Sequence, residues 1–140
     1  MTNNKAVSNF NPACRKVILG NTSAVLSMAI AADGGRAVSS AWFEDLRVWD
    51  LLTGESRRLE GHGGVIFGVS TNANGRVVVS GSTNTTVCVW NLHSGSLRVL
   101  TGHAGWVNAV AITHDGRFAV SGSNDKSVRM WDADFGRETV

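Results

Sequence analysis

The sequence predicts an all-β protein built from three copies of one small antiparallel sheet. Tryptophan recurs at a constant 41-residue interval, at Trp49, Trp90 and Trp131. Short apolar stretches alternate with polar turn residues, and no segment has the sustained 3.6-residue apolar period of a helix. A constant period of this size indicates an array of one supersecondary unit, and the short stretches indicate that strands form the unit.

The repeat extends to glycine and serine, and no insertion or deletion interrupts it from residue 20 onward. Four further sets of residues share the 41-residue interval: Gly20, Gly61 and Gly102; Gly34, Gly75 and Gly116; Ser39, Ser80 and Ser121; and Gly54, Gly95 and Gly136. Each glycine falls where the chain reverses between apolar stretches. We therefore expect these turns to need a positive φ, which glycine tolerates.

Each unit is predicted to contain four short strands. In the third unit the stretches 106–112, 118–121 and 127–131 are rich in β-branched and aromatic residues and are joined by connections of hairpin length. A fourth stretch follows a Ser-Gly turn, as at residues 97–100. Each unit is therefore expected to be a four-stranded antiparallel sheet.

The aligned positions place the three units at about residues 20–60, 61–101 and 102–140. Residues 15–19 align with the fourth strands at 56–60 and 97–101, so we expect an extra outer strand that belongs to a preceding sheet. Residues 137–140 align with the start of the same segment. Residues 1–14 are polar and lack the apolar stretch of a secretory signal, and we expect a flexible leader there.

These linked motifs resemble the WD-repeat β-propeller family. The resemblance rests on Gly61-His62 and Gly102-His103, each followed by an apolar strand, an Asn/Asp-Gly turn, Ser-Gly-Ser and a closing Trp-Asn or Trp-Asp, and it covers roughly residues 15–140. It implies blades of four antiparallel strands, in which each repeat supplies three strands of one blade and the outer strand of the blade before it. Closed propellers have about four to eight blades, so three repeats predict an incomplete propeller or one completed by oligomerisation.

The resemblance also implies a polar network that ties each blade together. In the third unit His103, Ser121, Asp125 and Trp131 match it completely. The second unit has His62, Ser80, Asn84 and Trp90, and we expect a weaker bond to His62 because Asn84 is neutral. The first unit has Asn21, Ser39, Phe43 and Trp49, where the network is not expected to form. The polar network is thus predicted to become more complete from the first unit to the third.

The degraded first unit has two interpretations. Terminal repeats of arrays are often atypical because they cap the stack. Alternatively, Trp42 and Phe43 replace ordinary turn residues because they contact a partner. The two interpretations are compatible.

The resemblance implies that partners bind the face formed by the start of each first strand and by the turn before the aspartate position. In this sequence those positions are Ala24, Leu26 and Trp42, then Val65, Phe67 and Thr83, then Trp106, Asn108 and Asn124. Large aromatic residues near turns are common interface anchors, which favours Trp42, Phe67 and Trp106. The alternative is that Phe67 and Trp106 fill gaps between blades.

Composition and motifs exclude several other classes. A net charge of +2 without a dense basic stripe makes nucleic acid an unlikely partner, and no stretch is long enough to predict a membrane span. Two cysteines give no disulfide framework, which with the polar start predicts a cytoplasmic location. No metal-ligand pattern or phosphate loop is present, so we expect no metal and no cofactor.

The residues Ser121, His103 and Asp125 superficially match a hydrolase triad, but their recurrence as Ser80, His62 and Asn84 indicates a structural network and not an enzyme. The predicted function is a noncatalytic scaffold that binds a protein or peptide through a propeller face. The alternative is a targeting or sensing propeller fragment of a longer multidomain signalling protein. Three repeats leave three arrangements open: part of a longer chain, a homodimer that completes a six-blade ring, and an open monomer.

Overall fold

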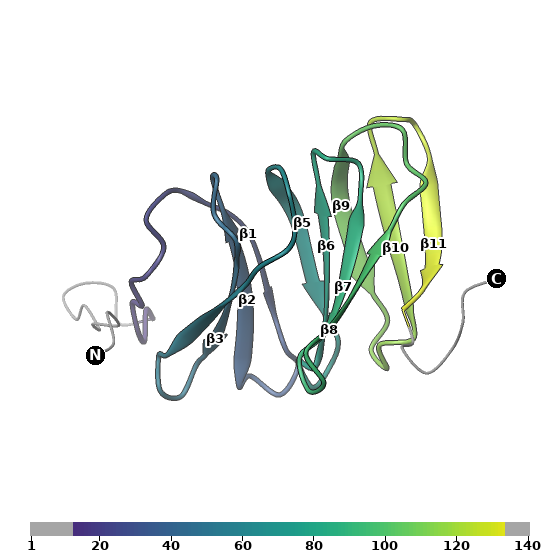
Figure 1. The fold of residues 1–140 in the computed structure, drawn as a ribbon. Coiled ribbons are helices and arrows are strands. Elements are labelled where there is room, and N and C mark those ends of the chain that lie inside the picture. The colour runs from purple at the N-terminus through teal and green to yellow at the C-terminus, as the bar shows by residue number, and fades with distance from the viewer. Residues whose placement is uncertain (1–12, 134–140) are drawn as a thin grey trace.

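The structure, a computed structural model, describes residues 13–133. In this range the chain forms eleven strands, arranged in three antiparallel sheets, and no helix. The sheets stand side by side in chain order (Figure 1). The all-β fold class and the repeated sheets are confirmed, and the three sheets form an incomplete propeller.

Within each sheet the strands lie in chain order. The first sheet contains β1 (Val25–Ile30), β2 (Arg36–Ala41), β3 (Leu46–Asp50) and β4 (Ser56–Leu59). The second contains β5 (Ile66–Thr71), β6 (Val77–Ser82), β7 (Val87–Asn91) and β8 (Ser96–Leu100). The third contains β9 (Val107–Ile112), β10 (Phe118–Ser123) and β11 (Val128–Asp132). The segment 137–140, which aligns with the start of a fourth strand, lies outside the described residues.

The segment 15–19 differs from the expectation of an outer strand. It has no regular secondary structure and runs as a purple trace beside the first sheet (Figure 1). A strand needs a neighbour to pair its backbone groups, and the described chain has no sheet before β1 for this segment to join. Of the expected leader, residues 1–12 lie outside the described residues.

The turns between the first two strands of each sheet confirm the role predicted for glycine. Gly34, Gly75 and Gly116 have φ values of 75°, 72° and 78°. An added Cβ at Gly75 would lie 3.1 Å from Ala31 Cβ, and one at Gly116 would lie 2.9 Å from Asn72 Nδ2, so these turns also approach the preceding sheet closely. A Cβ at Gly34 would meet nothing within 4 Å. Glycine at this aligned position therefore allows the positive φ of the turn in all three blades. In the second and third blades it also allows close packing on the preceding sheet.

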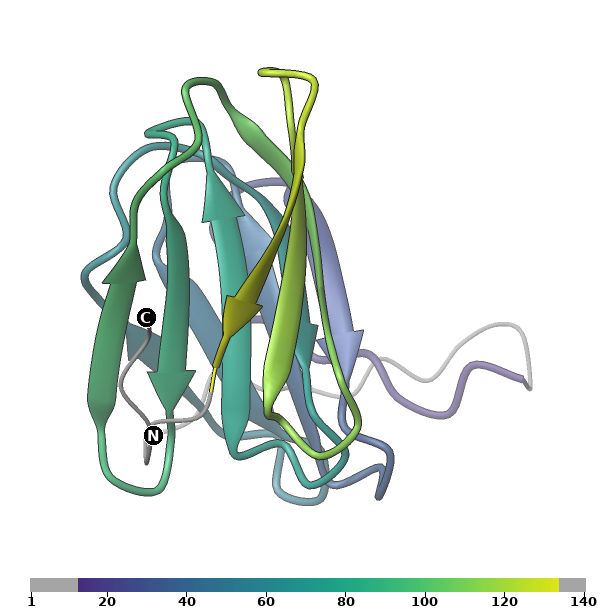
Figure 2. The same ribbon diagram turned by 90° about the vertical axis from the view of Figure 1, so that its right-hand side faces the viewer.

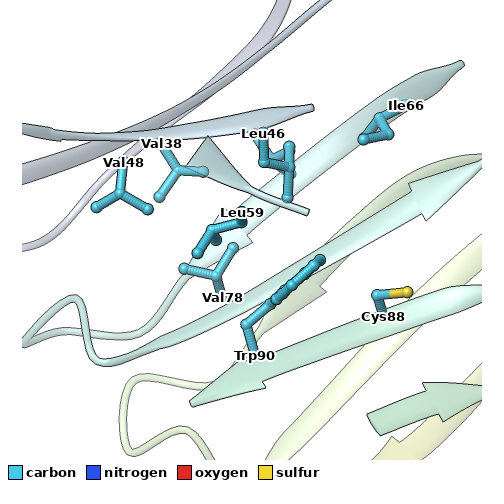
Figure 3. Close-up of a cluster of buried hydrophobic side chains, with 9 residues drawn as sticks. Val38, Leu46, Val48, Leu59, Ile66, Val78, Cys88 and Trp90 are labelled. Carbon is cyan, nitrogen blue, oxygen red and sulfur yellow. The ribbon is translucent and has the colours of Figure 1, made fainter. Parts of the chain in front are cut away.

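The core lies between the sheets. The first layer joins sheets one and two through Val38, Leu46, Val48, Leu59, Ile66, Val69, Val78, Cys88 and Trp90 (Figure 3). The second layer joins sheets two and three through Val79, Val87, Val89, Leu100, Val107, Ala119 and Ala133. Burying one Val, Leu or Ile side chain contributes about 1.5–3 kcal/mol, so these layers supply the main attraction between blades.

Within the part of the chain that the structure describes, the middle sheet is covered on both faces and the outer two sheets are each covered on one. Val79, Val87 and Val89 are fully buried between the second and third sheets. Their aligned counterparts on the third sheet, Val120, Val128 and Met130, are exposed, up to 79% at Val128. Figure 2 looks onto the side of the molecule where the third sheet lies. On the first sheet Met28 and Ile30 are likewise exposed. Each end of the array thus presents an apolar sheet face.

Candidate partner-binding face

A bulge near the start of the first strand recurs in all three sheets. The register of pairing with the second strand shifts there, and the extra residues are Leu26, Phe67 and Asn108. Bulges re-aim side chains and are common next to binding sites. All three residues belong to the face predicted from the sequence.

The turn between the second and third strands is tied to the start of the first strand by an equivalent backbone bond in each blade. The N–H groups of Trp42, Thr83 and Asn124 donate to the carbonyl oxygens of Ala24, Val65 and Trp106, at 3.2, 3.0 and 2.9 Å. These bonds bring six of the nine predicted positions together in pairs. The predicted face is therefore one structural feature, repeated once per blade.

Four aromatic side chains form a row across the three blades, which we call the aromatic row: Phe43, Trp42, Phe67 and Trp106. Their ring centroids are separated in that order by 5.7, 6.2 and 5.9 Å. The Trp42 and Phe67 rings meet edge to face. Trp42 and Trp106 are exposed, whereas Phe67 is half-buried between them. Phe67 thus fills a gap between the two tryptophans and also continues the row.

Phe43 was absent from the predicted face, although the sequence singled it out as an unusual turn residue. It is 86% exposed and has a φ of 57°. A bulky side chain at positive φ is strained, and such residues persist where function or the surrounding structure requires them. The signal in the sequence was a phenylalanine at the position that Asn84 and Asp125 occupy.

The remaining predicted positions extend the face with polar groups. Asn108 Nδ2 donates to Asn124 Oδ1 at 2.6 Å, and both residues are exposed. Thr83 Oγ1 accepts the Val65 N–H at 3.0 Å. Leu26 is half-buried on the first blade. The face therefore has an aromatic row with polar groups beside its Trp106 end.

The polar network of the third blade forms as predicted. His103 Nδ1 lies 2.8 Å from Asp125 Oδ2, and its Nε2 lies 2.7 Å from Ser121 Oγ. The Trp131 indole donates to the same hydroxyl at 2.8 Å. Ser127 and the Ala104 N–H also bond the Asp125 carboxylate, and these bonds, led by that of the Ser127 hydroxyl, hold the pKa of Asp125 well below its usual range. Every polar group of the network has a partner.

The network of the second blade is weaker than predicted, and the expected bond between His62 and Asn84 is absent. Asn84 Oδ1 instead accepts both the N–H and the hydroxyl of Thr86, at 3.2 and 2.6 Å. Among residues 13–133, neither ring nitrogen of His62 has a hydrogen-bond partner, and the Trp90 indole lies 3.4 Å from Ser80 Oγ. The prediction failed because a carboxamide has one acceptor atom where a carboxylate has two.

The first blade retains more of the network than predicted. The Trp49 indole donates to Ser39 Oγ at 2.8 Å, and Asn21 Nδ2 reaches the same hydroxyl at 3.5 Å. The expectation that no network forms there was wrong, because the indole–serine bond needs neither the histidine nor the aspartate. The polar network is therefore complete in the third blade, partly formed in the first and interrupted at the histidine in the second.

Comparisons with known proteins agree with this architecture. Two stretches, 54–91 and 94–132, match the family model described as "WD domain, G-beta repeat". The two matches together cover more than half of the 140 residues. The chain belongs to the WD-repeat family. Each matched WD repeat runs from the outer strand of one blade through the first three strands of the next, as the resemblance implied, and no match covers most of the first blade.

Solved structures show the same fold. Two of them, described as "Structure of U3-55K" and "Crystal structure of RRP9 WD40 repeats", each align with a TM-score of 0.73 and 20% sequence identity. Each alignment covers 81% of this chain and 37% of the solved chain. This WD-repeat chain therefore spans well under half the length of those proteins. The comparison with curated proteins found no match.

The described residues limit the chemistry of this WD-repeat chain. Ser121 and the His103 ring are buried, and the Ser121 hydroxyl is occupied by His103 and Trp131, so a substrate has no access to this triad-like set. Residues 13–133 contain no cluster of three metal-ligating side chains. Within the same range no helix is long and apolar enough to cross a membrane.

Proposed function

We propose that this WD-repeat chain is a noncatalytic scaffold that holds a protein or peptide partner on the aromatic row. The observation that carries the proposal is the meeting of aromatic residues from three blades in one row, in which Phe43, Trp42 and Trp106 are exposed. Tryptophan and other large aromatic residues are enriched among the residues that dominate binding energy at protein interfaces. A cytoplasmic location remains a prediction.

The composition of the face favours a protein or peptide over a small molecule. The aromatic row is an elongated, exposed surface, and the Asn108–Asn124 pair offers hydrogen-bonding groups beside its Trp106 end. An apolar centre with a polar rim is the ordinary anatomy of a protein interface. WD-repeat propellers are typically interaction scaffolds, which agrees with this proposal.

The test is partner capture by the immobilised full chain and its variants. We expect Trp42→Ala and Trp106→Ala each to reduce capture of bound proteins at least tenfold, while the β-sheet circular dichroism stays unchanged. Leu52→Ala is the matched control, because Leu52 is 87% exposed and lies in the β3–β4 turn away from the aromatic row. Unchanged capture by both tryptophan variants would overturn the proposal.

The exposed apolar faces of the first and third sheets favour a second proposal: further blades pack on these two faces. Val120, Val128 and Met130 align with the residues that pack each blade on its successor, and Met28 and Ala37 align with residues of the second blade, Val69 and Val78, that pack on the first. A second copy of the chain, placed head to tail, would supply this contact twice and give six blades. The alternative source is a longer multidomain signalling protein of which this chain is the targeting or sensing part.

Light scattering behind a sizing column tests the source of the missing blades. A monodisperse dimer that Met130→Glu converts to monomer supports the homodimer. Polydisperse aggregates, with no discrete dimer, overturn the homodimer and favour the longer chain, because uncovered apolar sheet faces associate without fixed geometry.

A further inference from the structure

The third sheet has one strand fewer than the other two within the described chain. β3 and β7 each pair with an outer strand, β4 or β8, whereas β11 has no strand on its side away from β10 within residues 13–133. Val128 and Met130 of β11 are 79% and 67% exposed, and the aligned Val87 and Val89 of β7 are fully buried. Such an edge offers unpaired backbone N–H and C=O groups to a further strand.

The two observed outer strands show what this edge accepts. Each has a leucine, Leu59 or Leu100, that is buried in the apolar layer between its own blade and the next. Each also has an arginine two residues earlier, Arg57 or Arg98. These arginines donate to a main-chain carbonyl near the end of the third strand of the next blade, at 3.4 and 3.0 Å. An outer strand therefore completes its own sheet and also holds the following one.

Residues 15–19 have the same pattern as these outer strands. At the 41-residue interval Ile18 aligns with the two buried leucines, and Lys16 aligns with the two arginines. The connection to the next strand also has the same length, because the first residue of β1, Val25, aligns with the first residue of β5, Ile66. The segment thus has the sequence of an outer strand for a blade that packs on the first blade.

The chain's own β11 is not within reach of this segment in the observed array. Residues 15–19 lie beside the first sheet, and the third sheet lies beyond the second (Figure 1). The connection between β4 and β5 joins blades that are direct neighbours, and the connection from residues 15–19 to β1 has the same length. The blade that this segment completes must therefore pack directly on the first one.

We propose that residues 15–19 of one copy pair as the fourth strand with β11 of a second copy, and that the reciprocal pairing joins the two copies into a six-blade ring. This inference rests on the homodimer of the second proposal and adds the strand that links its copies. In the register of β7 with β8, Ile18 lies opposite Val128 and Val17 lies opposite Arg129.

The contact between the copies would continue an interface that the chain already makes twice. Ile18 would enter an apolar layer between Val128 and Met130 of one copy and Met28 of the other, all three of which are exposed in the single chain. Lys16 would reach the main-chain carbonyls at the end of its own β3, as the aligned arginines do in the next two blades. The segment lacks regular structure in the single chain because its sheet belongs to the second copy.

A disulfide between the two strands tests the pairing directly. In a Cys14→Ser background, which removes the exposed native thiol, a chain with Val17→Cys is expressed together with a chain with Arg129→Cys. Opposed residues of antiparallel strands have Cα atoms about 4.5 to 5.5 Å apart, which a disulfide spans. We expect a linked pair of chains on a non-reducing gel, in at least tenfold higher yield than with Leu19→Cys in place of Val17→Cys.

Each single-cysteine chain alone serves as the blank for this gel. Equal yields from the Val17 and Leu19 pairs would overturn the exchanged strand, because Leu19 is two residues out of register with Arg129. The segment 137–140 aligns with the start of the same outer strand and would place Val140 opposite Arg129. A disulfide that forms within one chain carrying Arg129→Cys and Val140→Cys, with none between Val17→Cys and Arg129→Cys, would assign the edge to that segment and overturn the inference.

Ile18→Asp and Leu19→Asp form a matched pair, because they place the same charge on adjacent residues. Ile18 aligns with the buried leucines, whereas Leu19 aligns with Glu60 and Thr101, which are exposed. Sedimentation equilibrium of the full chain measures the dissociation constant of the dimer. We expect Ile18→Asp to raise it at least tenfold and Leu19→Asp to change it less than twofold. The same constant for both variants would contradict burial of Ile18 between the copies.

The outcomes separate this inference from the proposals that precede it. A dimer that Met130→Glu dissociates but Ile18→Asp leaves intact supports the homodimer and contradicts the exchanged strand. A wild-type chain that forms no discrete dimer overturns both. Partner capture that depends on Trp42 and Trp106 supports the scaffold in either case, because Ile18 and Met130 lie outside the aromatic row.

Discussion

The second and third blades pair their first three strands in the same way, but the polar network is complete only in the third. β6 pairs with β7 from Val77–Asn91 onward, and β10 pairs with β11 in the aligned register from Phe118–Asp132. Yet His103 has partners at both ring nitrogens, whereas His62 has none. The blade therefore forms without its polar network.

The difference follows from one substitution. Asp125 uses one oxygen for Ser127 and the other for His103 and Ala104. Asn84 uses its only oxygen for Thr86, and its amide nitrogen cannot accept a bond from His62. A side chain that can bond a residue two positions away along the chain is less available for a bond to a distant residue. Here the bond from Thr86 uses the Asn84 oxygen that His62 would need. The same histidine is thus a structural group in one blade and an unoccupied donor in the other.

The largest expected effect is a contrast between the two histidines. His103→Leu leaves Ser121 and Asp125 without their common partner, and we expect it to lower the free energy of unfolding by about 1.5 to 3 kcal/mol. His62→Leu replaces a ring without partners by an apolar side chain, so stability should be unchanged or rise by up to about 1 kcal/mol. Urea unfolding of the two variants and the wild type measures both values.

The two variants control for each other because the substitution and the aligned position are the same. Equal losses of stability in both would show that His62 is as well bonded as His103, which contradicts the structure of the second blade.

Acidification is expected to destabilise the protein through His62. Burial lowers its pKa from 6.5 to about 4 in the folded state. The unfolded chain therefore binds more protons between these pH values. The stabilisation is fully present above pH 6.5 and is lost as the pH falls through about 4. The full loss is about 3 kcal/mol, from 1.36 kcal/mol per pKa unit.

Urea unfolding at several pH values, with His62→Leu as the control, isolates this contribution. The wild type should lose stability between pH 6.5 and 4.5 relative to the variant, because the variant has no imidazole to protonate. The carboxylates whose pKa values are lowered, such as Asp125 and Asp115, act at lower pH and affect both proteins alike. Parallel curves over this range would contradict an unpartnered His62.

Much of the architecture could be predicted from the sequence, because the repeat fixes strand and turn positions at once. The positive φ of Gly34, Gly75 and Gly116 follows from glycine at a constant interval between apolar stretches. The complete network around His103 and the meeting of Trp42, Phe67 and Trp106 on one face were implied by the resemblance to the WD-repeat family.

Other features depend on competition between atoms, which the repeat does not encode. Asn84 can reach either His62 or Thr86, and only the structure shows that Thr86 takes its oxygen. Ser39 keeps its bond to Trp49 although the rest of the first network is lost, because that bond depends on strand pairing alone. Residues 15–19 do not form the expected strand, for a different reason. Strand pairing requires a neighbouring sheet, and the described chain contains no sheet before β1.

The smallest expected effect concerns the indole–serine bonds of the first and second blades. The Trp49 indole lies 2.8 Å from Ser39 Oγ, and the Trp90 indole lies 3.4 Å from Ser80 Oγ. Both tryptophans are 5% exposed, so replacement by phenylalanine removes a similar buried surface from each. We expect Trp49→Phe to cost about 1 kcal/mol more than Trp90→Phe in urea unfolding, because only the first loses a well-formed hydrogen bond.

A double-mutant cycle assigns that difference to the bond itself. Ser39→Ala combined with Trp49→Phe should cost about 1 kcal/mol less than the sum of the single variants, whereas the corresponding Ser80 and Trp90 cycle should be additive. Coupling of equal size in both cycles would contradict the distinction between the blades. Coupling in the first blade alone would show that the repeat without histidine or aspartate holds its inner strands more firmly than the repeat that has the histidine but lacks its acceptor.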